Sequence, residues 1–364
     1  MSPDIIVIGG GIAGASAAAL MAEKARVLVL EAEARPGTHS TGRSAAIFIR
    51  NYGNDALRAL NRLSEPVLEA PEGVSDTSLL SPRGELILAD ETELDDLAAY
   101  AEGAEGLERL TGAEAVEMVP ILRPEGVASA LYEPGARDID VDRMLSGYLR
   151  LLKARGGTVE TGAEVQALAR NGGLWEVQTS KGRFTAPLVV NAAGAWAEAI
   201  GRMAGALPMS LVPHRRSAAI LPAPEGHDPR GWPLFAAIRE TWYAKPDAGK
   251  LMVSPADADP VPAGDAWPDD MVLAEGLHRF EQAVTMEVTR VERSWAGLRT
   301  FAPDHTPVMG ADPVAEGFFW LAGQGGYGVQ TAPAMAEALA GEVFGQSALP
   351  ESLRAALSPA RFQA

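Results

Sequence analysis

The chain has 364 residues, of which 47% are hydrophobic and 22% charged, so it is long enough for two interleaved domains with ample cores. Its 48 acidic residues outnumber its 31 basic residues and give a net charge of −17, which disfavours nucleic acid and anionic membranes as partners. Because the chain contains no cysteine, disulfides, zinc–thiolate sites and thiol catalysis are excluded, and a reducing, cytoplasmic location is the expectation.

The first 31 residues predict a strand, a glycine-rich turn, a helix and a second strand. The runs "DIIVI" and "RVLVLE" are continuously apolar, as buried parallel strands are, and "IAGASAAALMAEKA" has the composition of a helix. These residues therefore predict a βαβ unit. An alternative interpretation of residues 5–22 is a signal peptide or a membrane span. Asp4 stands where that reading needs basic residues, and small residues dilute the run, so we expect no integral membrane segment.

The rest of the chain alternates between segments with clear strand and helix patterns and a segment rich in Pro, Trp and Asp. "LLSPRGELILAD" predicts a hairpin around Pro82 to Gly84, and residues 138–165 predict a helix capped by Asp140, a Gly-Gly stop and a strand. "APLVVNAAGAWAEAIGRMAG" predicts another apolar strand that breaks at glycine into a helix. Residues 205–293 are richer in Pro, Trp and Asp, and "GQGGYGVQTAPAMAEALAGEVFG" is a glycine-rich loop running into a helix.

This order predicts an α/β fold in which a Rossmann-like domain is interrupted by an inserted α+β domain with a mixed or antiparallel sheet. The expected dinucleotide-binding domain comprises residues 1–77, 137–203 and 294–364, and the expected substrate domain comprises residues 78–136 and 204–293.

The first glycine turn has the spacing of a dinucleotide-binding fingerprint. Gly9, Gly11 and Gly14 follow a strand and open a helix, and Glu31 ends the next strand, where a ribose-hydroxyl acceptor is needed. An acid at this position disfavours NADP but does not separate NAD from FAD. The second glycine loop, at residues 323–328, adds another helix N-terminus, which predicts one long cofactor that reaches both.

Several further motifs occur in one order along nearly the whole chain, among them "HSTGRSAA", "NAAGAW", "RRSA", "KPDAG", "SWAGLRTFAPDHTPVMG" and "GQGGYGVQT". Together they resemble the family of FAD-dependent amine-oxidising flavoproteins that includes D-amino-acid oxidase and glycine oxidase (the DAO family). Within that family the chain looks most similar to bacterial FAD-dependent D-arginine dehydrogenases.

The resemblance implies a non-covalent FAD site, position by position. The ADP half would contact Gly9, Gly11, Ile12, Ala13, Gly14 and Glu31, with the backbone of Val165 near the adenine. The remaining implied cofactor contacts are Thr41, Gly42, Arg43, Ser44, Ala45, Ala46, Ala193, Gly194, Trp196, Gly297, Gly325, Gly326, Tyr327, Gly328, Val329, Gln330 and Thr331. The helix after Thr331 would present its positive end to the anionic reduced flavin.

The resemblance also implies a substrate site. Arg216 and Arg299 would bind the substrate α-carboxylate, Tyr52 and Tyr243 would close over it, and Glu85 would meet the guanidinium of D-arginine. Gly326 and Gln330 complete the implied catalytic set. A carboxylate suits the planar arginine fork, and each charge-assisted hydrogen bond contributes about 1.5–3 kcal/mol. The expected reaction is oxidative deamination of a D-amino acid, with electrons passing to a quinone-like acceptor or an artificial dye; an oxidase is not excluded.

One departure from the resemblance bears on the substrate. Ile47 stands where the D-arginine enzymes have a histidine, and it makes the predicted pocket more apolar. Glu85 favours a cationic side chain instead, because a buried carboxylate needs a partner. A basic D-amino acid remains the first expectation.

Alternative interpretations stay open at this stage. The arginines could be ordinary ion-pair partners, the tyrosines core residues, and Glu85 a solvated residue beside a turn. The chain could oxidise glycine or sarcosine, or be a non-catalytic FAD-holding subunit of an opine- or proline-type dehydrogenase. The loop 47–55 is a candidate lid. No metal site is predicted, because the five histidines lack ligand spacing and Arg143 occupies the glycine position of a calcium loop counted from Asp138; His39 could form a histidyl–flavin bond.

Overall fold

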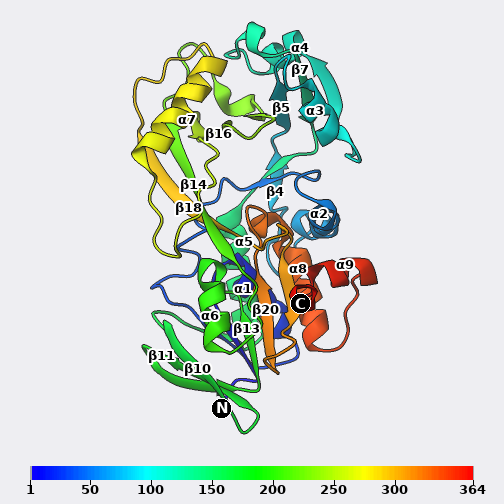
Figure 1. Ribbon diagram of the computed structural model, residues 1–364, viewed down its shortest axis with the longest axis vertical. Helices are drawn as coiled ribbons and strands as arrows, with labels where there is room; N and C mark the ends of the chain where they lie inside the picture. The colour runs from blue at the N-terminus through cyan, green and yellow to red at the C-terminus, as the bar shows by residue number, and fades with distance from the viewer. Residues whose placement is uncertain (1, 364) are drawn as a thin grey trace.

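A six-stranded sheet forms the centre of one lobe, at the bottom of Figure 1, in a computed structural model that describes residues 2–363. The apolar runs pair in parallel, with Ile5 opposite both Val27 and Leu188, and only the edge strand β19 is antiparallel. The order is β19-β20-β13-β1-β2-β9. The strands are β1 (Ile5–Ile8), β2 (Val27–Leu30), β9 (Thr158–Glu160), β13 (Leu188–Asn191), β19 (Val308–Ala311) and β20 (Phe318–Ala322).

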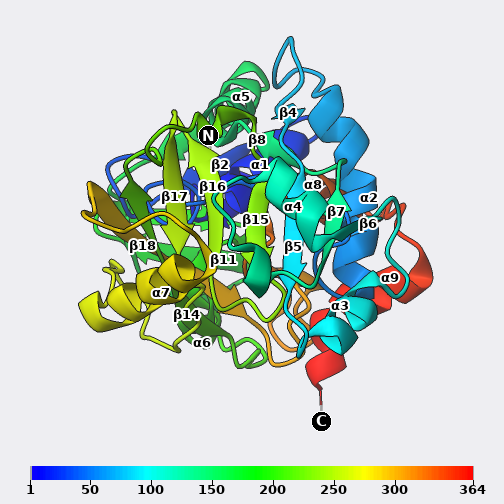
Figure 2. The same cartoon turned by 90° about the horizontal axis from the view of Figure 1, so that it is seen from above.

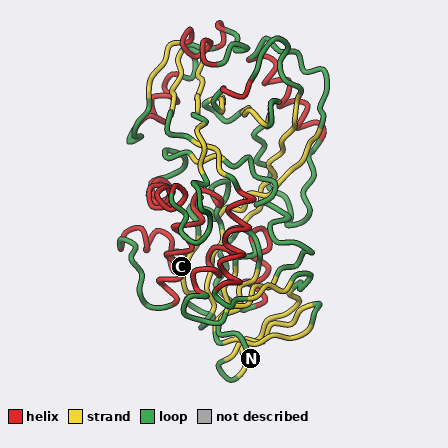
Figure 3. The backbone as a smooth tube through the Cα atoms, turned by 180° about the vertical axis from the view of Figure 1, so that it is seen from behind, coloured by secondary structure: helices red, strands yellow, loops and turns green. Residues whose placement is uncertain are grey.

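Two different layers cover this sheet. Helices share a core with one face: α1 (Ile12–Met21), α2 (Asp55–Glu69), α5 (Val141–Ala154), α8 (Gly328–Val343) and α9 (Glu351–Leu357). The other face packs against β10 (Val165–Asn171), β11 (Leu174–Thr179), β12 (Gly182–Ala186), η2 (Gly194–Trp196), α6 (Ala197–Met203) and η4 (Pro359–Phe362). Asp140 caps α5 as predicted, accepting a hydrogen bond from the Arg143 amide at 2.9 Å. Figure 3 shows these helices packed together from behind, with β10–β12 below them.

A mixed eight-stranded sheet forms the second lobe (Figure 2). Its order is β18 (Arg293–Phe301), β14 (Val212–Leu221), β17 (Lys250–Ser254), β16 (Tyr243–Asp247), β15 (Leu234–Ala237), β5 (Glu85–Ala89), β7 (Ser129–Glu133) and β6 (Glu108–Thr111). Two helices share a core with one face: α4 (Gly112–Met118) and α7 (Asp270–Ala283). The short helices η1 (Pro124–Gly126) and η3 (Pro229–Gly231) precede core residues Val127 and Trp232. Helix α3 (Leu94–Ala101) packs on the opposite face, beside Ile87 and Leu234. Because side chains alternate along a strand, Glu85 and Ile87 share that opposite face.

A third, small sheet joins β3 (Ile47–Phe48), β8 (Arg137–Ile139) and β4 (Leu80–Pro82) between the lobes. The predicted hairpin around Pro82 to Gly84 is therefore wrong: β4 pairs with β8, whereas β5 pairs with β7 and β15. Gly84 has a φ of +80°, and there the chain leaves one sheet and enters another.

The predicted fold class is confirmed, since a Rossmann-like lobe carries an inserted lobe with a mixed sheet. The domain boundaries stay a prediction, and one sheet departs from them. Strand β18 pairs with β14 over residues 293–301, which joins these residues to the upper lobe although the predicted boundary falls at 294. No helix within residues 2–363 is long and apolar enough to cross a membrane.

Candidate cofactor and substrate site

The turn between β1 and α1 requires glycine for steric reasons. Gly9 has a φ of +107°, and a Cβ there would lie 2.4 Å from the Ala192 carbonyl oxygen. A Cβ on Gly14 would lie 1.9 Å from the Gly9 oxygen, so the helix is packed directly onto the turn. This packing brings the N-terminus of α1 to the wall of a cavity, as a pyrophosphate site requires.

Glu31 is buried at the end of β2 and faces the same turn. Its two carboxylate oxygens accept hydrogen bonds from the Gly10 amide at 2.7 Å and from the Glu33 amide at 2.8 Å. Each oxygen keeps a second lone pair for a ribose hydroxyl. Glu31 and Val165 both line a cavity of about 470 Å³ that continues to Thr41 and Gly325. The cavity fits an elongated dinucleotide that begins at Glu31.

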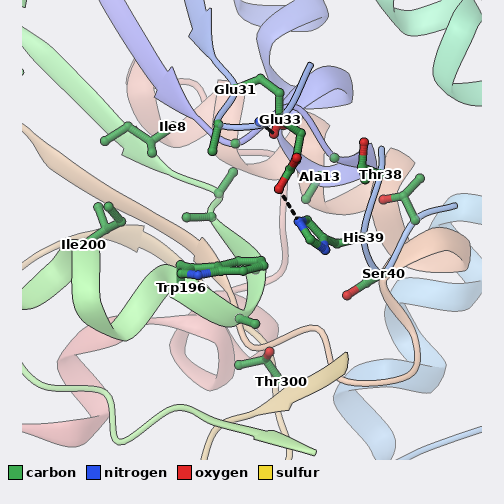
Figure 4. Close-up of a pocket in the computed structure, with 18 of the residues that line it drawn as sticks. Ile8, Ala13, Glu31, Glu33, Thr38, His39, Ser40, Trp196, Ile200 and Thr300 are labelled. Carbon is green, nitrogen blue, oxygen red and sulfur yellow. Dashed lines mark hydrogen bonds and ion pairs between the residues drawn. The ribbon is translucent and has the colours of Figure 1, made fainter. Parts of the chain in front are cut away.

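The middle of this cavity is shaped by an aromatic pair (Figure 4). The His39 ring lies 4.7 Å from the Trp196 ring, and its Nε2 lies 2.9 Å from Oε1 of Glu33. His39 therefore lies in the dinucleotide cavity and not among the residues that line the second cavity described below. The Thr41 hydroxyl also has a partner within the protein, because it accepts a hydrogen bond from the Ile12 amide at 3.0 Å.

Most of the predicted cofactor residues line this cavity or its continuation. The first cavity is lined by Gly9, Gly11, Ile12, Ala13, Glu31, Thr41, Val165, Ala193, Gly194, Trp196, Gly325 and Gly328. Arg43, Ser44, Ala45, Ala46, Gly297, Gly326, Val329 and Gln330 line the second cavity. Gly14, Gly42, Tyr327 and Thr331 line neither; Gly14 instead packs on Gly9, and the Thr331 hydroxyl donates to the Tyr327 carbonyl at 2.9 Å.

The second cavity, of about 230 Å³, lies between the two lobes and shares Ile12, Thr41 and Gly325 with the first. It brings together all seven residues of the predicted catalytic set, from six separate stretches of the sequence. They are Tyr52, Glu85, Arg216, Tyr243, Arg299, Gly326 and Gln330.

Arg299 has no carboxylate within 4.0 Å among residues 2–363. Burial alone favours the neutral guanidine, but Tyr52, Tyr243 and Glu240 outweigh it and leave the pKa of Arg299 raised, so the side chain stays charged. Gly326 leaves room for it, because a Cβ there would lie 2.9 Å from the guanidinium carbon. A charged fork without a protein counter-ion is a site for an anionic ligand group.

Arg216 is weakly paired. Its Nε donates to the Asp257 carbonyl at 2.7 Å, while its Nη2 is 3.9 Å from the exposed carboxylate of Glu240. The guanidinium lies 6.0 Å from the ring of Tyr243, at the limit of a cation–π contact. Arg216 therefore has donors free for a ligand in the cavity.

Tyr52 lies beside these cations and packs on Tyr327, with ring centroids 4.7 Å apart. Burial raises the pKa of Tyr52 despite the neighbouring Arg299, so its hydroxyl keeps its proton. A protonated hydroxyl can donate to a carboxylate, which suits the role that the resemblance implied.

The side chain of Gln330 is hydrogen-bonded within the protein and contacts the segment that carries Tyr52. Its Nε2 donates to the side-chain oxygen of Asn61 at 2.7 Å, and its Oε1 accepts from the Ile49 amide at 3.2 Å. The Asn61 amide in turn donates to the carbonyl of Tyr52 at 3.1 Å. Gln330 is thus a positioning residue, and the segment that we considered as a lid is held by several buried hydrogen bonds.

Helix α8 begins at Gly328, whereas the sequence placed its start after Thr331. The turn that precedes it uses Gly325 at a φ of +51°, where a Cβ would lie 2.2 Å from the Phe301 ring. The earlier start brings the helix N-terminus directly to the shared part of both cavities. Its free amides thus face the end of the cofactor cavity that adjoins the substrate cavity.

Glu85 is buried and not solvated beside its turn, with 5% of its surface exposed. Its Oε2 has no hydrogen-bond partner among residues 2–363. Burial, followed by the charges of Glu133 and Glu240, raises the pKa of Glu85 well above its usual value. Sequence reasoning also missed Tyr100 and Glu240, which line the same cavity without belonging to any recognised motif.

The βαβ turn, the buried acid and the long cavity define a dinucleotide-binding protein. The chain matches the family model "DAO: FAD dependent oxidoreductase" over residues 4–342 and belongs to that family. It is therefore an FAD-dependent oxidoreductase, as the resemblance predicted. The glycines of the α1 turn, Glu31 and the N-terminus of α8 are the groups that would hold FAD.

Relatives of known name agree on this family and differ in substrate. The chain is 27% identical to glycine oxidase of Geobacillus kaustophilus, over 91% of this chain and 90% of that one. The crystal structure of glycine oxidase from that organism superposes with a TM-score of 0.85 at 25% identity, covering both chains fully. Human mitochondrial sarcosine dehydrogenase is 25% identical over 87% of this chain but only 37% of its own length. L-proline dehydrogenase from P. horikoshii shares the fold, with a TM-score of 0.84 at 24% identity and coverage of 99% and 98%. A special closeness to D-arginine dehydrogenases is not among these findings.

Proposed function

We propose that this enzyme oxidises the Cα–N bond of a D-amino acid, with a basic side chain such as that of D-arginine favoured. The observation that carries the proposal is Arg299, a charged guanidinium without a carboxylate partner, facing the cavity that adjoins the cofactor cavity. The product is an imino acid, which water hydrolyses to a 2-oxo acid and ammonia. Bound FAD, held non-covalently, supplies the two-electron oxidant.

The residues of the chain supply placement. Arg299 and Arg216 bind the two oxygens of the substrate α-carboxylate, and the protonated hydroxyl of Tyr52 and that of Tyr243 add donors to it. This clamp fixes the direction of the Cα–H bond toward the cofactor cavity, and orientation of this kind supports large rate effects. The site lies between the lobes, and both lobes contribute residues to its wall.

The walls of the cavity suit both an apolar substrate side chain, which Ile47 favours, and a cationic one, which Glu85 favours. Ile47, Ile87 and Leu234 make an apolar passage, and Glu85 lies on it as a buried acid without a basic partner among residues 2–363. Lysine and arginine side chains have the same build, an apolar stem with a charged head. The apolar residue at 47 therefore suits the stem of a basic substrate, while Glu85 suits its head.

The test is an anaerobic visible spectrum of the purified holoenzyme before and after D-arginine, D-leucine and L-arginine are added separately. The proposal expects bleaching of the flavin band by the D-isomers, with D-arginine faster than D-leucine. Bleaching by L-arginine alone would contradict the stereochemistry, and no bleaching by any amino acid would contradict the reaction class.

The electron acceptor forms part of the proposal. We propose a quinone-like acceptor, for which an artificial dye can substitute, because the motifs resemble those of a dehydrogenase. Hydrogen peroxide measured with substrate and oxygen alone decides the question, and rapid peroxide formation would make the enzyme an oxidase.

A second candidate function is oxidation of glycine or sarcosine. The similarity to glycine oxidase and to sarcosine dehydrogenase favours it. The cavity, however, extends past the carboxylate clamp to Glu85, which a substrate without a side chain would leave unused. Flavin bleaching by sarcosine but not by D-arginine would establish this alternative.

Binding of D-arginine is expected to strengthen as pH rises. The raised pKa of Glu85 means that the free enzyme holds a proton there to a higher pH than an ordinary carboxyl does, and below that pKa a guanidinium must displace it. Below the pKa of Glu85, the dissociation constant should therefore fall about tenfold per pH unit and level off above it. D-Leucine should lack this dependence, and Glu85→Gln should abolish it for D-arginine. Spectral titration of the flavin over about pH 5.5–8, where the substrate amine keeps its charge, measures both; equal slopes for the two substrates would contradict the role of Glu85.

A further inference from the structure

Two polar atoms without partners lie in the side-chain part of the substrate cavity. One is Oε2 of Glu85, on strand β5, and the other is the hydroxyl of Tyr100, on helix α3; among residues 2–363 neither has a hydrogen-bond partner. Both residues line the same cavity. Buried polar atoms almost always use their hydrogen-bonding capacity, and this acid and phenol together keep acceptor lone pairs that no donor of the protein fills, which points to a ligand that carries donors.

The Tyr100 hydroxyl is close enough to Glu85 to lower the pKa of that carboxyl as a hydrogen-bond donor, against the larger effect of burial. No other group among residues 2–363 pairs with either atom. Glu133 lies directly across from Glu85 in the register of β5 and β7. Its oxygens accept from the Arg50 amide at 2.8 Å and from the Asn51 side chain at 2.7 Å. Glu133 is thus occupied, and as a second acid it repels ionised Glu85 and donates nothing to it. Tyr100 keeps its proton, because burial and then Glu85 and Glu133 raise its pKa.

The position of Tyr100 is fixed by its helix. Tyr100 packs in one apolar cluster with Ile47, Ile87 and Leu234, the residues that line the passage. Arg239 ties this helix to the β15–β16 turn through Asp96 at 2.7 Å. The hydroxyl is therefore held at the apolar wall beside Glu85.

We propose that Tyr100 is a specificity-determining residue that, together with Glu85, receives the head of the substrate side chain and selects a guanidinium. This inference rests on the proposed function. A guanidinium carries N–H donors on several edges of one plane, so it can donate to a carboxylate and to a phenolic oxygen at once. An ammonium is a compact charge and reaches such a pair less completely. D-Arginine should therefore be preferred over D-lysine, and both over D-leucine.

The test compares the wild-type holoenzyme with Tyr100→Phe, which keeps the ring and removes the orphan hydroxyl. Rates of anaerobic flavin bleaching are measured against concentration for D-arginine, D-lysine and D-leucine. We expect the efficiency with D-arginine to fall by about 10- to 100-fold, the loss that follows from one hydrogen bond to a charged group. Efficiency with D-leucine should rise, because the hydroxyl no longer lies unpartnered against an apolar side chain.

The matched control is Tyr132→Phe. Tyr132 precedes Glu133 on β7 but packs in the core on the other face of the sheet. It should leave the ratio of D-arginine to D-leucine efficiency at the wild-type value. Glu85→Gln is the second variant, expected to lower the ratio as well and to lower the D-lysine efficiency more strongly than Tyr100→Phe does.

The outcomes separate this inference from the proposed function. If the wild type is bleached by D-amino acids but Tyr100→Phe keeps the wild-type ratio, the role of Tyr100 is refuted and the proposed function stands. If only glycine or sarcosine bleaches the flavin, the side-chain site is refuted together with the D-amino-acid proposal. Absence of bleaching by every amino acid overturns both.

Discussion

Replacing Arg299 by methionine is expected to lower kcat/KM for the preferred D-amino acid by about 10²- to 10⁴-fold, the loss of a bidentate charged contact at about 1.5–3 kcal/mol per hydrogen bond. The reason is that Arg299 has no carboxylate of its own, so its donors are free for the substrate. Steady-state kinetics with an artificial dye as acceptor measure the effect. Arg299→Lys retains the charge but not the planar fork, and it should recover only part of the activity.

The stability of the same variant distinguishes a binding role from a structural one. An unpaired charge in a partly closed cavity does not stabilise the fold, so Arg299→Met should leave the melting temperature of the ligand-free holoenzyme unchanged or raise it. Arg83 offers a contrasting control, because it pairs with Asp138 at 2.6 Å and bonds two carbonyls, and Arg83→Met should lower that temperature. A large loss of stability in Arg299→Met with retained turnover would contradict the carboxylate clamp.

The parts of the fold that the sequence predicted correctly are those fixed by neighbours in the chain. The turn at Gly9 to Gly14 depends on local backbone sterics, and the cap of α5 at Asp140 depends on a contact three residues away. Local patterns of this kind carry their own physical reason. The dinucleotide lobe could therefore be predicted from the sequence before any sheet was assembled.

The errors arose where distant segments decide the structure. The stretch around Gly84 has the composition of a hairpin, but its two strands find better partners in different sheets. Strand β18 likewise pairs with β14, which is far away in the sequence, so it joins the sheet of the upper lobe. Turn residues favour a reversal of the chain without specifying which strands will pair.

In the candidate site, too, residues in local motifs could be predicted and residues placed by distant contacts could not. Arg216, Arg299 and Tyr52 were found because they stand in or near recognisable motifs, and they meet in one cavity. Tyr100 has no motif, and it reaches the cavity only because α3 packs across β5 and β7. The burial of Glu85 could not be inferred either, since a residue beside a turn is usually solvated and here a parallel partner strand covers it.

Replacing Gly14 by alanine is expected to weaken FAD binding strongly and to destabilise the lower lobe. The added Cβ would lie 1.9 Å from the Gly9 carbonyl oxygen and 3.3 Å from the Ala192 Cβ, so α1 must move away from the turn. Overpacking of a core costs about 1–3 kcal/mol, and a backbone atom yields less readily than a side chain. The melting temperature of the apoprotein should therefore fall by about 2–12 °C at about 2–4 °C per kcal/mol. The displacement also removes the aligned amides of α1 from the pyrophosphate position, and FAD affinity, measured by quenching of flavin fluorescence, should weaken at least about a hundredfold.

The matched control for that substitution is Gly126→Ala, because a Cβ on Gly126 meets nothing within 4 Å. This variant should retain the flavin content and the melting temperature of the wild type. Gly9→Ala should resemble Gly14→Ala, since its Cβ would lie 2.4 Å from the Ala192 oxygen and its φ is +107°. The two failures have different origins, one in the approach of helix to turn and the other in the left-handed backbone of the turn itself. If Gly14→Ala bound FAD as tightly as Gly126→Ala does, the contact between α1 and the turn would not be what holds the amides in place, and the cofactor site would have to depend chiefly on Glu31 and the N-terminus of α8.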